Sequence, residues 1–188
     1  GVPCVGGSAH VANLFRVERA SGSIRRLTFD QDHDWCPTVM PDGKVLYLRW
    51  EYSDIPHFVS RLLFQMNPDG TEQREYYGSN SYWPNSTFFA RPVPGSATRF
   101  IGVVSGHHDT ARMGDLILFD VAKGRHAADG VVQRIPGRGL TVEPLIRDGL
   151  TKANWPKFLH PWPLSASFFL VACKPAPAAP WGLYLADV

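Results

Sequence analysis

The sequence has few cysteines, and those it has lie far apart. Cys4, Cys36 and Cys173 are the only three among 188 residues. An odd number cannot form a complete disulfide framework and leaves at least one free thiol. The absence of Cys-x-x-Cys and Cys-x-x-Cys-His motifs excludes zinc ribbons, thioredoxin-like sites and covalently attached c-type haem. Because Cys36 and Cys173 lie in strand-like segments, we interpret them as small buried hydrophobic residues, with a catalytic thiol as the alternative.

Long apolar runs and a surplus of one charge are also missing. No run of about 18 apolar residues occurs, so we expect no membrane insertion. The 19 basic and 17 acidic residues give a net charge of +2, and the basic residues are scattered. This argues against nucleic acid as a partner. The first residues show neither a signal-peptide pattern nor an initiator methionine, so we expect a mature form or an excised piece of a longer protein.

Three passages of the chain repeat one another in outline. Each has an aromatic-proline entry, a tight turn and an apolar β run, and a second β run then follows and ends on an acidic or amide residue. Repeats at this period indicate a propeller, a solenoid or an array. The copies begin at Trp35-Cys36-Pro37, Trp83-Pro84 and Leu159-His160-Pro161.

Short strands and turns account for most of the sequence, and long helical patterns are absent. Pro-Asp-Gly occurs at 41–43 and again at 68–70. Proline presets φ, aspartate bonds its own backbone, and glycine supplies the positive φ that a hairpin requires. We therefore predict an all-β fold built from propeller blades of four antiparallel strands each.

The repeats divide residues 1–188 into the blades of a single partial propeller domain. Closed propellers have roughly four to eight blades, whereas this chain supplies about three to four. Its open blade edges should therefore pair with other blades of a parent protein or with a second copy. The predicted division is the end of a blade at 14–28, full blades at 35–77 and 82–135, an insertion loop at 136–158, and an incomplete blade at 159–188.

One cluster of side chains suggests a metal site. His107, His108 and Asp109 follow an apolar β run, and imidazole with carboxylate can bind zinc or another transition metal. Adjacent residues of a strand point to opposite faces, however. The alternative is a set of polar residues that satisfies the backbone of a loop.

A second group of residues is predicted to lie at one mouth of the propeller. Glu51, Tyr52 and Asp54 end a strand in the same way as the histidine cluster does, and Arg91 lies within an apolar strand. They are candidate ligand-contacting residues. The alternatives are solvated loop carboxylates and, for Arg91, an ion pair between blades. No catalytic residue is assigned, since no Ser-His-Asp or phosphate-binding motif occurs.

The turn Pro41-Asp42-Gly43-Lys44 resembles the WD40-like repeat of TolB-type propellers. A more specific pattern lies in segments 50–54, 66–71, 76–81, 90–96, 106–108, 161–165 and 181–185. Together these segments resemble the middle propeller domain of the hydrazine synthase alpha subunit family. The resemblance implies a six-bladed-type propeller and a periplasmic or otherwise extracytoplasmic location. That family works through c-type haems, and this chain has no attachment motif, so the resemblance does not extend to the chemistry and the cofactor stays unknown.

These observations predict a binding or assembly scaffold within a larger extracytoplasmic protein, not an enzyme by itself. The expected partners are other domains or blades of that protein and a second copy of the chain. The alternative is a part, not catalytic on its own, of a metal- or haem-dependent redox enzyme that resembles the hydrazine synthase alpha subunit.

Overall fold

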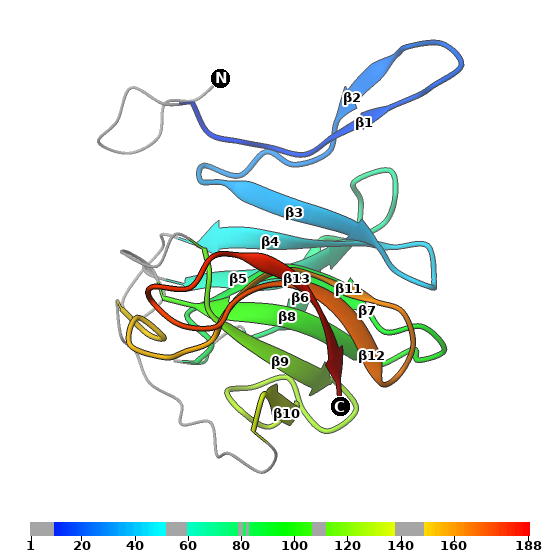
Figure 1. Ribbon diagram of the computed structural model, residues 1–188. Helices are drawn as coiled ribbons and strands as arrows, with labels where there is room; N and C mark the ends of the chain where they lie inside the picture. The colour runs from blue at the N-terminus through cyan, green and yellow to red at the C-terminus, as the bar shows by residue number, and fades with distance from the viewer. Residues whose placement is uncertain (1–9, 52–59, 79–80, 82, 107–111, 138–148) are drawn as a thin grey trace.

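A computed structural model describes residues 10–51, 60–78, 81, 83–106, 112–137 and 149–188 (Figure 1). All regular elements in these ranges are β-strands, which are joined by turns and loops. None of the described segments forms an apolar helix of membrane-spanning length. The prediction of an all-β fold is confirmed.

The chain begins with a two-stranded hairpin that stands apart from the other sheets in Figure 1. Strands β1 (Phe15–Val17) and β2 (Ile24–Arg26) pair in antiparallel fashion. The hairpin is attached through its base, where the Leu27 amide donates to the Leu14 carbonyl and both side chains are buried.

Two four-stranded antiparallel sheets follow. They are joined by a single parallel pairing of Arg61 with Ser86. The Gly43 φ of 84° and the hydrogen bond from the Lys44 amide to the Asp42 carboxylate show that the first Pro-Asp-Gly turn forms as predicted. The first sheet contains β3 (Asp34–Val39), β4 (Val45–Glu51), β5 (Ser60–Met66) and β6 (Arg74–Tyr77), and the second contains β7 (Ser86–Pro92), β8 (Arg99–Ser105), β9 (Asp115–Asp120) and β10 (Val131–Ile135).

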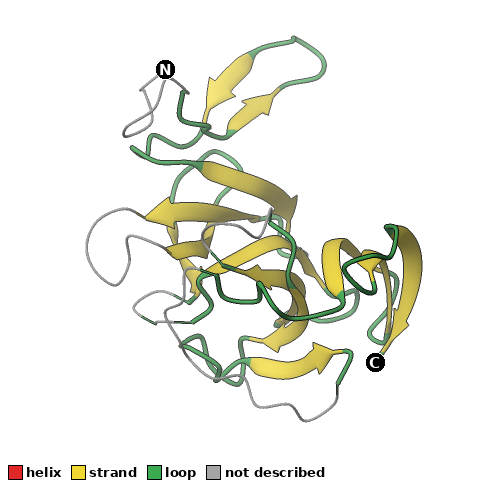
Figure 2. Ribbon diagram, turned by 60° about the vertical axis from the view of Figure 1, so that its left-hand side comes forward, coloured by secondary structure: helices red, strands yellow, loops and turns green. Residues whose placement is uncertain are grey.

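The last sheet has three strands, β11 (Lys157–Pro163), β12 (Phe168–Lys174) and β13 (Gly182–Asp187). In Figure 2 it lies at the side of the molecule marked by the C-terminus. Strand β13 pairs only with β12, and β1 pairs only with β2, so the described sheets do not close into a ring.

The core lies between successive sheets, face against face, which is how propeller blades stack. Leu14 and Leu27 of the hairpin meet Tyr47, Leu62 and Met66 of the first four-stranded sheet. The contact between the two four-stranded sheets is rich in aromatic residues, and the contact with the last sheet is mainly aliphatic. The former contains Leu46, Leu63, Tyr76, Tyr77, Trp83, Phe100, Val104, Ile117 and Phe119; the latter contains Ile101, Val103, Leu116, Leu118, Ile135, Phe158, Phe169, Val171 and Cys173.

One predicted boundary is wrong at its C-terminal end. The insertion loop was expected to extend to residue 158, but β11 begins at Lys157. Phe158 pairs with Cys173 and exchanges backbone hydrogen bonds with Gly114, and these contacts draw the end of the expected loop into the sheet. Residues 138–148 of the expected loop lie outside the described residues.

Candidate functional site

The first strands of the three larger sheets share a β-bulge at the same position. The pairing register shifts by one residue between Trp35 and Thr38 in β3, between Phe88 and Arg91 in β7, and between Leu159 and Trp162 in β11. A bulge leaves one residue unpaired and redirects the side chains around it. The repeat seen in the sequence is therefore also a repeat in backbone geometry.

Each bulge holds one non-glycine residue in the left-handed region. The φ angles are 53° at Cys36, 55° at Phe89 and 51° at His160. Residues other than glycine rarely adopt this backbone conformation, and those that do are found most often at functional sites. Strand β7 contacts both β3 and β11, and the three side chains line one small cavity of about 60 Å³. The bulges thus bring together residues from three sheets.

The chemistry of these three side chains favours binding over catalysis. The Phe89 ring lies 4.1 Å from the His160 ring, measured between centroids. Burial raises the pKa of the Cys36 thiol, although the Phe89 backbone and the charges of two nearby arginines act against it. A thiol that stays protonated is a poor nucleophile. The prediction of a small buried residue is confirmed for Cys173, whereas Cys36 is only partly buried.

Arg91 is the one predicted mouth residue whose side chain the structure describes. It follows the bulge of β7, and its guanidinium carbon lies 4.3 Å from the centroid of the Trp162 ring on β11. One interpretation of the sequence predicts that Arg91 contacts a neighbouring blade, but through an ion pair. Among the described residues, Arg91 forms a cation–π contact and no ion pair. The partner could not be found from sequence, because Trp162 is 71 positions away in the chain.

The other predicted mouth and metal residues cannot be placed. Tyr52, Asp54 and the cluster of His107, His108 and Asp109 lie outside the described residues. Glu51 ends β4, and only its backbone is described, paired with Ser60. In the part of the chain that the structure describes, no three His, Cys, Asp or Glu side chains come close enough together to hold a metal ion.

Aromatic rings and arginines stack at the end of the sheets where β3 begins and β4 ends. His33 lies parallel to Trp35 at a centroid distance of 4.8 Å, and Trp50 continues the stack. Arg61 and Arg112 both lie over the Trp35 ring. The amide of Ala12 donates to His33 Nδ1, so the neutral imidazole carries its proton on Nε2.

Burial lowers the pKa of His33. The charges of Arg112 and Arg61 lower it further, and Asp32 acts in the opposite direction. His33 therefore stays neutral at physiological pH. Sequence reasoning did not identify this stack, because its members come from separate strands and loops.

A buried carboxyl group lies beside this stack, under the hairpin. Asp34 is almost inaccessible, its Oδ1 has no hydrogen-bond partner, and Asn13 reaches its Oδ2 only at 3.5 Å. Burial raises its pKa to about 7, and the nearby charge of Asp30 adds to this effect. Hydrogen bonds from Thr28 and Asn13 and the charge of Arg49 oppose the shift.

We expect Asp34→Asn to stabilise the protein at pH 8 and to change little at pH 4. The pKa of Asp34 in the folded state lies above its unfolded value near 3.8. The stability that protonated Asp34 contributes is therefore fully present below pH 3.8 and is lost as the pH rises through about 7. Each unit of pKa difference corresponds to about 1.4 kcal/mol, so the gain at pH 8 should be on the order of 4 kcal/mol. Urea unfolding at both pH values measures it. An equal effect at the two pH values would contradict the assigned ionisation.

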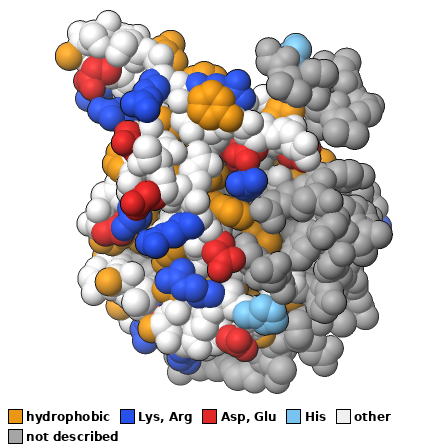
Figure 3. All heavy atoms as spheres, turned by 180° about the vertical axis from the view of Figure 1, so that it is seen from behind, with side chains coloured by type: hydrophobic (Ala, Val, Ile, Leu, Met, Phe, Trp, Pro, Cys, Tyr) orange, Lys and Arg blue, Asp and Glu red, His pale blue; other side chains and the backbone are white. Residues whose placement is uncertain are grey.

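Charges on the molecular surface are mixed. On the face seen in Figure 3, basic and acidic side chains lie next to one another. Ion pairs of this kind join Lys44 to Asp42 and Arg49 to Asp30.

Comparison with known proteins identifies a structural neighbour but no family. Neither a protein-family model nor a curated protein sequence matches this chain. Among solved structures, the Kuenenia stuttgartiensis hydrazine synthase matches 90% of the chain with a TM-score of 0.60 and 17% identity. The match covers 20% of the hydrazine synthase chain. The fold is therefore shared with a segment of that protein, and a likeness at this identity establishes the fold alone.

Proposed function

We propose that this chain is a segment of a β-propeller that acts as an assembly and binding scaffold within a larger protein. The structural likeness to hydrazine synthase supports a shared fold. The relationship to the middle propeller domain of the alpha subunit, in a six-bladed-type ring outside the cytoplasm, is proposed from the sequence motifs alone. The hydrazine synthase reaction is a property of that structural neighbour and is not proposed for this chain. The function proposed here is to hold further blades and to present loops and inner strands to a ligand.

The observation that carries this proposal is the apolar outer face of the last sheet. On β12, Phe169, Val171 and Cys173 are buried against the preceding sheet. The opposite face contains large apolar residues as well, and these stay exposed in the described part of the chain, although the Arg91 guanidinium lies over one of them, Trp162. Exposed there are Trp162 (54%), Phe168 (43%), Leu183 (76%) and Leu185 (58%).

An apolar surface of this kind marks an interaction site. The three interfaces already present in the chain each join a sheet face to another sheet face. The repeat therefore supports a further blade of the same kind as the partner of the outer face.

The free edge of β13 supports the same proposal. Beside it lies a groove of about 350 Å³, lined by Gln133, Ile135 and Tyr184 among others. In the first four-stranded sheet, the corresponding place is filled by the fourth strand, β6, and by the turn before it. Gln73 of that turn donates to the Leu27 carbonyl of the hairpin. A fourth strand added to β13 would satisfy its unpaired backbone groups and cover this groove.

Light scattering tests the proposal on the purified chain. We expect the chain to self-associate through the outer face and to give a mass above that of one chain, since isolated edges and apolar faces find partners. Leu183→Lys combined with Leu185→Lys should restore the monomer, because two buried charges without partners oppose association. A wild-type chain that stays monomeric as its concentration rises would refute the role of this face.

The matched control is Phe29→Lys. Phe29 is 73% exposed but lies between β2 and β3, away from the last sheet. It should associate like the wild type. Loss of association in this variant as well would indicate a general effect of added charge and would count against the assigned face.

A further inference from the structure

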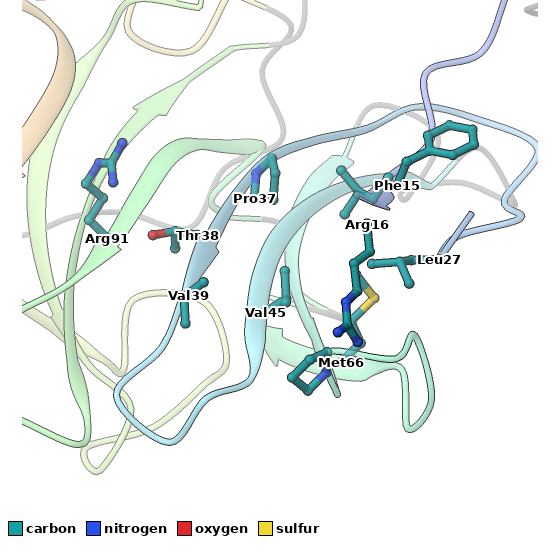
Figure 4. A pocket seen from close by; sticks show the side chains of 11 residues that line it. Phe15, Arg16, Leu27, Pro37, Thr38, Val39, Val45, Met66 and Arg91 are labelled. Carbon is teal, nitrogen blue, oxygen red and sulfur yellow. The ribbon is translucent and has the colours of Figure 1, made fainter. Parts of the chain in front are cut away.

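A second surface of the molecule is hollowed and does not depend on the assembly face. A groove of about 480 Å³ lies between the hairpin and the first strands (Figure 4). Its volume falls within the range of about 300–1,000 Å³ typical of small-molecule sites. Most of the side chains that line it are apolar, including Leu14, Leu27, Val39, Val45 and Met66.

Two guanidinium groups flank this apolar surface. Figure 4 shows Arg91 at one side of Thr38 and Val39, and Arg16 at the other side of Val45. Arg16 is mostly solvent-exposed and already contacts Glu18 at 3.5 Å. Arg91 is half-buried, is held in place by the Trp162 ring, and makes no ion pair with a described residue. Within the described residues, the groove therefore has one oriented cation with no anionic partner.

We propose that the groove binds a small organic carboxylate with an apolar chain. The carboxylate accepts hydrogen bonds from the Arg91 guanidinium, whose planar fork matches two carboxylate oxygens. The Trp162 ring fixes the plane of that fork. The Thr38 hydroxyl provides a further polar group in the same lining. The apolar chain lies along Val39 and Val45 towards Leu27 and Met66.

The charge pattern favours this ligand over a β-strand from another blade. An apolar strand laid in the groove would cover Arg91 and leave its charge without a partner, which is costly in a protein interior. A carboxylate provides that partner while its chain covers the same apolar residues. The groove shares no lining residue with the outer face of the last sheet, although Trp162 of that face contacts Arg91.

Octanoate and 1-octanol test this site by calorimetric titration of the full chain. The two probes have the same chain length and differ in charge. We expect octanoate to bind roughly tenfold more tightly, as one charge-assisted hydrogen-bonded contact predicts. Arg91→Gln should remove this preference and leave octanol binding unchanged. Equal affinity of the wild type for both probes, or no binding of either, would overturn the proposal.

Two further variants test separately how the charge and the apolar chain of the ligand contribute to binding. Arg25→Gln removes an exposed arginine of the hairpin that does not line the groove, and should keep the preference for octanoate. Val39→Phe changes an exposed lining residue and narrows the groove, so it should weaken both probes alike. If Val39→Phe affects neither probe, the chain binds elsewhere and the assigned groove is wrong. This result is readable even if Arg91→Gln fails to fold.

Discussion

Replacing Gly114 with alanine is expected to lower the free energy of unfolding by about 3 kcal/mol or more. A Cβ atom at this position would overlap the backbone carbonyl of Val104, and the Thr151 hydroxyl lies close on another side. Val104 pairs with Asp115, so its carbonyl is held in the ladder between β8 and β9 and cannot move aside cheaply. The overlap is with backbone, which makes it more costly than contact with a flexible side chain.

Gly114 also joins two sheets, which adds to the expected loss. It exchanges backbone hydrogen bonds with Phe158 at the start of β11. A displaced Gly114 would loosen the last sheet as well as the second. Urea unfolding followed by circular dichroism measures the effect.

Gly149→Ala serves as the control for this substitution. Gly149 is an exposed turn residue at which a Cβ would meet only the Lys152 side chain at ordinary contact distance. We expect its stability to change by no more than about 0.5 kcal/mol. Equal stabilities for the two variants would show that the close approach at Gly114 is absent in solution.

The strand repeat could be predicted because turn chemistry and alternation are local. Pro41-Asp42-Gly43 forms the expected turn, and Asn67 just after β5 and Asp120 at the end of β9 begin the next turns. The alignment of the copies was less accurate. Trp83-Pro84 was matched to Trp35-Cys36-Pro37, but the bulges show that Phe88 is the equivalent of Trp35. Trp83 is instead a buried residue ahead of β7.

The candidate sites were harder to predict, because they form between sheets. Arg91 was singled out for its position in an apolar strand, yet its contact with Trp162 depends on how β7 lies beside β11. The left-handed residues Cys36, Phe89 and His160 have nothing in common as residue types. Only their shared bulge groups them, and a bulge leaves no signature in a single sequence when the residue at positive φ is not glycine.

The proposed assembly face and the proposed ligand groove follow from the same architecture. Sheets stacked face to face leave an uncovered apolar face at the end of the series, and Leu183 and Leu185 lie there. First strands that lie side by side leave their inner edges open, and the bulges direct side chains such as Arg91 along those edges. A scaffold of this kind can assemble through one surface and bind a ligand at another without either role disturbing the other.

Truncating Phe119 to alanine should lower the free energy of unfolding by about 3–5 kcal/mol. Its side chain is completely buried between the two four-stranded sheets. The Phe100 ring is stacked on it at 4.7 Å, and the Tyr77 ring meets it edge-on at 4.9 Å. Each aromatic pair adds about 0.5–1.5 kcal/mol beyond the burial of its area. Since domains of this size are stable by only about 5–15 kcal/mol, a large part of the total would be lost.

The loss should extend beyond the cavity itself, because Tyr77 has a second task. Its hydroxyl donates to the Ala127 carbonyl and accepts from the Gly130 amide, which anchors the turn before β10. The near-ultraviolet circular dichroism signal should therefore weaken, and the urea concentration at the midpoint of unfolding should fall with it. Phe29→Ala, which removes an exposed ring, should change stability by no more than about 0.5 kcal/mol. If Phe119→Ala were as stable as this control, the aromatic contact could not be what holds the two sheets together, and the stacking of blades would have to rest on another interface.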